Sequence, residues 1–409
     1  MNKLSRLFMQ QLVLSGLIIS GTPCPAIQLP VIVASQNNSY SNNYHTNNDN
    51  YSMPSSVATR NYAALQQALA VYENAAAHPW PTISSKVRLL KPGMKNIYVM
   101  ALRSRLEATG ELKNSDNMGL DVYDDTLENA VMAFQACHGL NPDGIVGNDT
   151  RTELNIPPQQ RIKQIQVNMA RWAKLSGELG DHYIMVNVPA YRLDLVENGN
   201  TVLSMRAIVG KPTRPTPEIS STVTRIIFNP YWNVPKLIAQ KDIVPKILND
   251  PGYLDEMHIK VINREEDNAP EINPEEIDWQ TASEEGFKYH FRQDPGENNA
   301  LGLVKFEFQN SHDVYMHDTP AKDLFDADKR AFSSGCIRLE RPFDLVTYLM
   351  QENINWSDER MQDILEEGKT SYIKIARPMP VIITYLTAWV DDDGNLQFRD
   401  DIYGLDQNS

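Results

Sequence analysis

The residues best suited to chemistry lie in the stretch FSSGCIRLERP, residues 332–342, where Cys336 follows two serines and a glycine. Cysteine chemistry needs a thiolate, a base within hydrogen-bond reach, and donors that stabilise negative charge on an attacked carbonyl oxygen. Residue type alone leaves three interpretations of Cys336 open: a buried structural residue, a nucleophile or a metal ligand.

His317 is the candidate base. It ends the strand-like segment DVYMH, and residues 318–335 give the chain enough length to bring that strand end opposite Cys336. Gly335 permits close backbone approach, so the amides of Gly335 and Cys336 are candidates for an oxyanion hole. Ser333 and Ser334 add short hydroxyls that we expect to orient the imidazole or the loop. Taken alone, His317 is as consistent with a structural role, and only its pairing with this loop favours catalysis.

A metal site has less support than a nucleophile. Zinc sites use three or four ligands at close spacing, and Cys336 with His312 and His317 does not form such a set. We therefore expect neither a metal nor a cofactor.

Composition bounds the class of protein. The chain has 409 residues, 42% of them hydrophobic and 22% charged, which is ordinary for soluble domains and predicts two or three of them. The formal net charge of −14 argues against nucleic acid or anionic lipid as a general partner.

The N-terminus predicts export. Two basic residues precede an apolar run from Leu7 to Ile19, followed by small residues and prolines, which is the order of a secretory signal. The run is shorter than the ~20 residues that span a bilayer, so a signal that stays attached as an anchor is the alternative. We assign residues 1–35 to a signal peptide and the Asn- and Ser-rich residues 36–58 to a disordered linker.

Three cysteines need separate explanations. Cys24 lies in the predicted signal peptide, so we expect it to be removed. Cys137 and Cys336 fall in different predicted domains, so we expect no disulfide between them in an oxidising compartment. We expect Cys137 to be a buried free thiol, because it continues an apolar stripe with Leu127, Val131 and Phe134 at helical spacing.

The first half of the chain is helical. Residues 59–84 and 157–180 are predicted scaffold helices, and they flank a compact unit over residues 85–156. In that unit, Asp125 and Glu128 have the spacing of a capping box, and the run NPDGIVGNDT makes a turn before another helix.

The second half alternates with the two-residue period of strands. Ile184, Val186 and Val188 begin the pattern, and Asn198-Gly199 predicts a hairpin turn. We assign residues 181–377 to a mostly β domain in which residues 236–285 are an inserted segment that covers the substrate. Residues 378–409 form a C-terminal extension with a hairpin turn at Asp393-Gly394. The predicted fold class is thus a multidomain α+β protein.

Two resemblances to known families follow from these motifs. LRSRLEATGEL and YDDTLENAVMAFQACHGLNPDGIVGNDTRTELN are similar to the small three-helix peptidoglycan-binding module. YMHDT followed by SSGCIRL resembles the L,D-transpeptidases of the YkuD type, and FRQDPGENNALGLVKFEF and AIVGKPTRPTPEISS resemble two further stretches of that family. The order of the segments is similar to the long periplasmic, YcbB-like branch.

The second resemblance implies a fold, a location and a reaction. The fold is a β-sandwich or barrel-like sheet, and the location is the periplasm. The reaction is a 3→3 cross-linking of peptidoglycan through a cysteine thioester, with tetrapeptide stems as acyl donors. Peptidoglycan stem peptides and glycan are the implied partners, and carbapenem β-lactams are the implied inhibitors. L,D-carboxypeptidase activity, transfer of a lipoprotein to peptidoglycan, and a non-catalytic wall-binding scaffold are the alternatives.

The resemblance also assigns roles to residues. It makes Cys336 the nucleophile and His317 the base, and it places Ser334 where many members have histidine. Arg338 is expected either to bind a stem-peptide carboxylate or to hold the loop through a salt bridge. Tyr315, on the strand face of His317, and Trp232 are expected to line the substrate cleft or to belong to the core.

Overall fold

The computed structural model describes residues 57–113, 119–264, 269–284 and 288–407. The predicted signal peptide and nearly all of the predicted linker lie outside these residues. Within the described ranges, no helix has the length and apolar character needed to span a membrane. The chain divides into two compact units.

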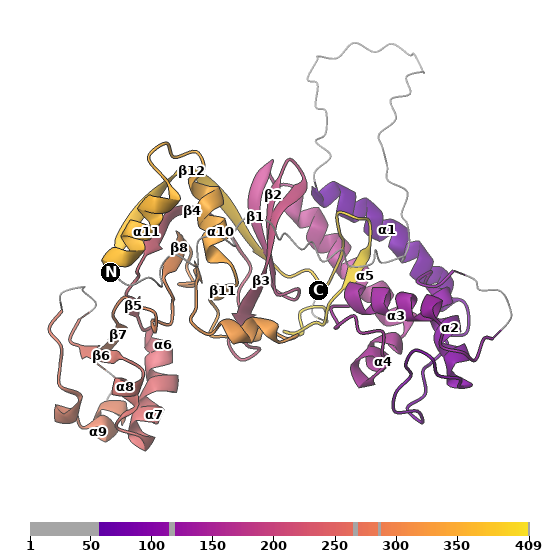
Figure 1. Cartoon of the computed structure of the whole chain (residues 1–409), viewed down its shortest axis with the longest axis horizontal. Coiled ribbons are helices and arrows are strands. Elements are labelled where there is room, and N and C mark those ends of the chain that lie inside the picture. The colour runs from indigo at the N-terminus through magenta and orange to yellow at the C-terminus, as the bar shows by residue number, and fades with distance from the viewer. Residues whose placement is uncertain (1–56, 114–118, 265–268, 285–287, 408–409) are drawn as a thin grey trace, which may run out of the picture. The chain divides into compact units, whose positions relative to one another are not determined.

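The first unit comprises residues 63–169 and 388–398. Its helices and strands, together with the two long helices that run into the second unit, are α1 (Val57–Ala76), α2 (Tyr98–Ala108), α3 (Asp125–Cys137), α4 (Asn148–Leu154), α5 (Pro158–Leu175), β13 (Ala388–Val390) and β14 (Leu396–Phe398). Figure 1 shows the helices in indigo to magenta. The strands β13 and β14 pair as the predicted hairpin, and Gly394 adopts the positive φ that such a turn requires.

Helix α3 supplies the core of this unit. Its predicted stripe is buried, with Leu127, Val131 and Phe134 at 0% exposure. The helix is capped by Asp124, whose side chain accepts from the Leu127 amide at 2.9 Å, so the predicted capping pair is one residue late. Cys137 is buried as predicted, but it is disulfide-bonded, so the expected free thiol is wrong.

The second unit is built on a nine-stranded sheet with the order β10-β3-β11-β9-β8-β4-β12-β1-β2. An additional pairing joins β2 to β3, so the sheet curls into a barrel-like form. The strands are β1 (His182–Asn187), β2 (Arg192–Glu197), β3 (Asn200–Gly210), β4 (Ile219–Phe228), β8 (Val304–Phe308), β9 (Met316–His317), β10 (Ala331–Ser333), β11 (Ile337–Leu339) and β12 (Ser371–Thr384).

The core of the barrel-like sheet consists of the inward-facing side chains of these strands. Residues such as Ile184, Val186 and Phe306 are at 0% exposure, and each such side chain stabilises the fold by about 1.5–3 kcal/mol. Helices α10 (Pro342–Met350) and α11 (Asp358–Glu367) lie beside the sheet (Figure 1). They pack on this core through apolar side chains.

The inserted segment extends beyond the predicted residues 236–285, to residues 232–293, and has a small sheet and core of its own. Strands β5 (Trp232–Asn233), β7 (His290–Gln293) and β6 (Ile259–Ile262) pair in that order. The helical elements of the segment are α6 (Lys236–Ile238), η1 (Ala239–Ile243), α7 (Val244–Asn249), α8 (Tyr253–Glu256), η2 (Pro274–Glu276) and α9 (Trp279–Glu284). The segment KYHFRQ, residues 288–293, contains β7 and so belongs to this small sheet.

Candidate active site

The register between β9 and β11 sets the positions of the two main site residues. These strands are parallel, and Ile337 pairs with Met316 while Arg338 pairs with His317. Ile337 and Met316 point into the core. Because side chains alternate along a strand, His317 and Arg338 lie on the other face, and Cys336, two residues before Arg338, lies there too.

Two further residues share this face. Lys305 on β8 pairs directly with His317. Tyr315 lies two residues before His317, and the centroids of their two rings are 5.6 Å apart. The Lys305 Nζ lies 3.9 Å from the centroid of the Tyr315 ring, a cation–π contact. The site is therefore a strand face that carries one thiol, one imidazole, one phenol and two cations.

The loop before Cys336 is held by Ser333, which is 2% exposed. Its Oγ donates to the Cys336 carbonyl at 2.5 Å and accepts from the Gly335 amide at 3.1 Å. Gly335 has a φ of 119°, which only glycine adopts without strain. The Gly335 amide is therefore engaged within the loop, which differs from the predicted oxyanion donor, while the Cys336 amide has no such bond in the described residues.

The segment at residues 207–221 encloses this loop. The Lys211 amide donates to the Ser333 carbonyl at 3.0 Å, and the Thr216 hydroxyl donates to the Gly335 carbonyl at 2.8 Å. A Cβ at Gly210 would lie 2.2 Å from a backbone oxygen, so only glycine fits there. These contacts explain why this stretch of sequence accompanies the cysteine motif.

Ser334 is exposed and faces an ion pair rather than the imidazole. Its Oγ accepts from Arg214 Nη1 at 3.0 Å, and Arg214 Nη2 donates to Asp242 Oδ1 at 2.9 Å. The neighbouring Asp242 carboxylate raises the pKa of Arg214. Since Asp242 belongs to η1 of the inserted segment, Arg214 and Asp242 tie that segment to the cysteine loop.

The imidazole of His317 is buried and neutral. Burial is the largest cause that lowers the pKa of His317 to about 3, and the nearby Arg338 and Lys305 cations lower it further. Hydrogen bonds to the backbone of Asp318 and Leu301 act in the opposite direction. Nδ1 lies 2.5 Å from the Asp318 carbonyl. Because a carbonyl can only accept a hydrogen bond, this contact assigns the proton of the neutral ring to Nδ1.

Residues that the sequence analysis did not single out hold this imidazole in place. Gly302 has a φ of 60°, and a Cβ there would lie 2.3 Å from Asp318 Oδ2. Asp318 Oδ2 accepts from the Leu303 amide at 3.0 Å. Asn299 Oδ1 accepts from the Leu301 amide at 2.8 Å, which fixes the backbone beside the imidazole. The run NNALG lies within FRQDPGENNALGLVKFEF, one of the stretches that resemble the L,D-transpeptidases. This run was the sequence signal that could have indicated Asn299 and Gly302.

The thiol of Cys336 is partly exposed and protonated in this arrangement. Its Sγ lies 3.9 Å from the Asp313 carbonyl, the acceptor for the S–H group. Burial raises the pKa of Cys336, while the Tyr315 amide and hydroxyl and the Lys305 and Arg338 cations act in the opposite direction. A protonated thiol beside a neutral imidazole needs the imidazole as a base at the moment of attack.

The turn before β9 aims the Asp313 carbonyl at the sulfur. Asp313 has a φ of 53°, which is uncommon outside glycine. Asn310 holds the turn, because its Nδ2 donates to the Val314 carbonyl at 2.7 Å and its Oδ1 accepts from the Val314 amide at 3.1 Å. Neither residue was singled out from the sequence.

Arg338 has no carboxylate partner among the described residues, so the predicted loop salt bridge is absent there. Its Nε is buried without a hydrogen-bond partner in the described structure. Burial lowers the pKa of Arg338, and the neighbouring Cys336 opposes that shift. The structure thus leaves a largely desolvated cation close to the thiol.

Trp232 reaches the site from β5 of the inserted segment. It packs against the core of that segment and lies close to the side chain of Tyr315, which in turn lies close to Cys336. Trp232 and Tyr315 therefore lie at the site, and both side chains are also partly buried.

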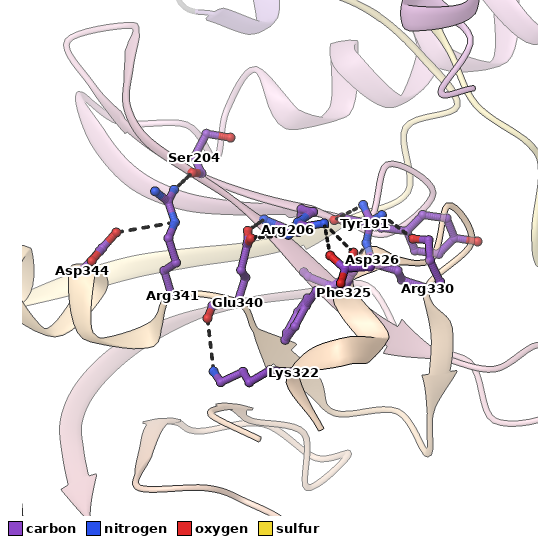
Figure 2. A network of polar contacts seen from close by, with 12 residues as sticks. Tyr191, Ser204, Arg206, Lys322, Phe325, Asp326, Arg330, Glu340, Arg341 and Asp344 are labelled. Carbon is purple, nitrogen blue, oxygen red and sulfur yellow. Dashed lines mark hydrogen bonds and ion pairs between the residues drawn. The ribbon is translucent and has the colours of Figure 1, made fainter. Parts of the chain in front are cut away.

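A polar network holds the chain between His317 and Cys336 (Figure 2). Arg206 Nη2 donates to Glu340 Oε1 at 2.7 Å, and Arg206 Nη1 donates to the Phe325 carbonyl at 2.8 Å. Lys322 Nζ donates to the Glu340 carbonyl at 3.1 Å. It also donates to Asp318 Oδ1 at 2.6 Å. The residue after the imidazole is thus joined to the strand that follows the cysteine.

A cavity of about 470 Å³ opens beside this face, between β4, β8 and the turn before β9. Lys305, Asp313 and Tyr315 line it, together with Arg225 and Glu307. In the described ranges, no group of His, Cys, Asp and Glu side chains has an arrangement suited to a metal ion.

Two protein families match segments of this chain. Residues 181–382 match the family described as "YkuD: L,D-transpeptidase catalytic domain". These residues therefore resemble an L,D-transpeptidase catalytic domain. Residues 98–154 match the family described as "Putative peptidoglycan binding domain". The barrel-like sheet and the helical unit confirm the predicted α+β fold class, and both predicted family resemblances are confirmed.

Known proteins resemble the L,D-transpeptidase domain to different degrees. A protein of Haemophilus influenzae named "Putative L,D-transpeptidase" is 36% identical over 224 residues, which are 55% of this chain and 44% of that protein. The chain thus spans less than half the length of this relative. An L,D-transpeptidase from Stackebrandtia nassauensis is 11% identical over 75% of this chain and 97% of that one, with a TM-score of 0.27.

L,D-transpeptidase 3 from Mycobacterium tuberculosis, solved with a faropenem-derived adduct, is 14% identical to this chain. The match covers 50% of this chain and 60% of that chain, with a TM-score of 0.24. Scores this low add nothing to the description of the site.

Proposed function

We propose that this protein forms 3→3 peptidoglycan cross-links through a thioester on Cys336, with tetrapeptide stems as acyl donors. One observation carries the proposal: the β9–β11 register puts a free thiol and a buried, neutral imidazole on one face of adjacent strands. Beside them lies a cavity of a size that small-molecule sites commonly have.

The first half-reaction is acylation of the thiol. Cys336 Sγ attacks the carbonyl carbon of the third, diaminopimelate-type residue of the stem, and His317 Nε2 accepts the thiol proton. The carbonyl π electrons move onto oxygen, where the Cys336 amide is the candidate donor. The tetrahedral intermediate then collapses, the C–N bond to the terminal D-Ala breaks, and His317 returns the proton to the leaving amine.

The second half-reaction releases the acyl group. The side-chain amine of a second stem attacks the thioester carbonyl, and His317 removes a proton from that amine as the new amide bond forms. The C–S bond breaks and the thiol is restored. The cross-link then joins the third residues of two stems. Water as acceptor would give a tripeptide, and a lipoprotein lysine would give an attached lipoprotein.

Arg338 has the properties of an anion-binding group in this reaction. It is largely desolvated, has no carboxylate partner in the described structure and lies beside the thiol. We assign to it a carboxylate of the donor stem, since a charge-assisted contact in a dry site is stronger than one in water. Ser333 and Gly335 shape the loop, and Ser334 fixes it to the inserted segment.

The unit that includes residues 98–154 is assigned to holding peptidoglycan glycan or stem peptide near the catalytic domain. Such a substrate lies outside the cytoplasm, and we place the protein in the periplasm, exported by its N-terminal segment. Attachment to a membrane through an uncleaved signal is the alternative for that segment.

The decisive experiment incubates the protein with disaccharide-tetrapeptides and follows products by mass spectrometry, with Cys336→Ala as the control. Cross-linked dimers that depend on Cys336 support the proposal. Tripeptide alone would instead indicate a carboxypeptidase, and wall binding without turnover a scaffold. A carbapenem should acylate Cys336, because its strained carbonyl is a similar electrophile, and an unchanged intact mass after long incubation would count against this.

A further inference from the structure

The cavity beside the thiol has a charge pattern that plays no part in the acyl transfer described above. Of its charged lining residues, Arg225 and Glu307 neutralise each other, with Arg225 Nε donating to Glu307 Oε2 at 2.7 Å. Lys305 and Asp313 also line it, and neither forms an ion pair in the described structure. The cavity thus presents one uncompensated cation and one uncompensated anion.

Lys305 is placed to act on a ligand. Its Nζ lies over the Tyr315 ring, 3.9 Å from the centroid. Burial lowers the pKa of Lys305, which marks the cost of holding this ammonium away from water, while Glu307 and Asp313 favour the charged form. A ligand carboxylate would replace the lost hydration of the ammonium.

Asp313 supplies the opposite charge within the same wall. Its carbonyl faces the Cys336 sulfur at 3.9 Å, so the residue stands between the thiol and the cavity. Its backbone is in the left-handed region and Asn310 holds the turn, so the place of Asp313 in the cavity wall is set before a ligand binds. The two charged residues and the thiol therefore lie in one region of the site.

We propose that this cavity is a subsite for the free amino-acid end of the diamino acid side chain of the acyl donor, with Lys305 binding its carboxylate and Asp313 its ammonium. The assignment depends on the proposed function, because it takes the carbonyl at Cys336 to belong to that same diamino acid. The side chain leaves the chain one carbon from the attacked carbonyl, and the cavity begins at residues that touch the thiol. The donor therefore fits this cavity without any acceptor being present.

The inference predicts selectivity between donors. A free-acid donor satisfies both charges, whereas a donor with that carboxylate amidated leaves Lys305 unpaired. A hydrogen bond between charged groups that is lost with its partner left buried costs about tenfold or more in affinity. Selectivity should therefore depend on Lys305 and should already be present in the acylation half-reaction.

The test measures release of D-Ala from two disaccharide-tetrapeptides, one with the free diaminopimelate carboxylate and one with it amidated, under single turnover with the enzyme in excess, so that no second stem is left to act as acceptor. The readout is the ratio of the two kcat/KM values, in which any common effect on thiol reactivity cancels. We expect the wild type to favour the free acid by about tenfold or more and Lys305→Met to bring the ratio close to one. Lys305→Arg should retain part of the preference. Lys163→Met, an exposed lysine on α5, is the matched control and should keep the wild-type ratio.

Several outcomes would overturn the subsite. A wild-type ratio near one means that the cavity does not read this carboxylate. A ratio lost in Arg338→Met but retained in Lys305→Met assigns the carboxylate to the other cation. Selectivity that appears only when an acceptor is added would place the acceptor here instead. Carbapenem acylation of wild-type Cys336 is measured in parallel, because its absence would refute the proposed function rather than the subsite.

Discussion

The protonation state of the Cys336–His317 pair can be measured directly, and the structure predicts it. Burial raises the pKa of the thiol from its usual value of 9.0 and lowers the pKa of the imidazole to about 3. Between these values the resting pair is a thiol beside a neutral imidazole. With a thiol pKa above 9.0, the thiolate fraction at pH 7 is below about 1%.

Alkylation by iodoacetamide reports this fraction, because the thiolate is the reacting species. We expect the logarithm of the alkylation rate of Cys336 to rise with pH at a slope near one from about pH 6 to pH 9, without a plateau on the acid side. His317→Ala should leave this profile nearly unchanged, since the imidazole is uncharged in the resting enzyme. The same variant should lower kcat/KM for the tetrapeptide donor by about 10²-fold or more, because the general base is lost.

The pH dependence of turnover follows from the lowered pKa of His317. A neutral imidazole is present above pH values of about 3, so kcat/KM for the donor should fall only on strong acidification. A plateau of rapid alkylation between pH 5 and pH 7 that disappears in His317→Ala would refute this reasoning. That result would show a thiolate–imidazolium ion pair in the resting enzyme.

Four substitutions at three places test how the site is held. Gly302→Ala puts a methyl group against Asp318 and should lower kcat/KM by more than about tenfold by displacing the imidazole, while intact protein mass and carbapenem titration check that the thiol is present. Ser333→Ala leaves two buried backbone groups unpaired at a cost of about 1–3 kcal/mol, which hydrogen exchange of the loop should detect as increased opening. Asp242→Asn and Arg214→Met are combined in a double-mutant cycle on the carbapenem acylation rate. Their effects should not be additive, with a coupling of about 1 kcal/mol or more. Additive effects would show that the ion pair does not order the loop.

The sequence patterns predicted which residues form the site better than they predicted the contacts between those residues. The strand end at His317 and the glycine before Cys336 follow from period and residue type, and the register then brings both residues to one face. The amide of Gly335 was assigned to substrate, but the structure uses it for Ser333. Backbone hydrogen bonds of this kind depend on loop geometry, which residue types do not encode.

The supporting residues were harder to find for a related reason. Gly302 and Asn299 lie far from His317 along the chain, and they act through close packing and backbone hydrogen bonds. The insertion was predicted from the break in the strand pattern, but its pairing of β7 with β5 and β6 joins segments about 60 and 30 residues apart. Short strands of that kind carry too little period to reveal their partners.

The most direct test is intact-mass analysis of the protein in molar excess over a disaccharide-tetrapeptide, so that no second stem is left to act as acceptor. The account predicts an adduct equal to the donor minus D-Ala, carried by the peptide that contains Cys336 and absent from Cys336→Ala. It also predicts that a second stem chases this adduct into a dimer. Product formed with no adduct on Cys336, or formed equally well by Cys336→Ala, would contradict it.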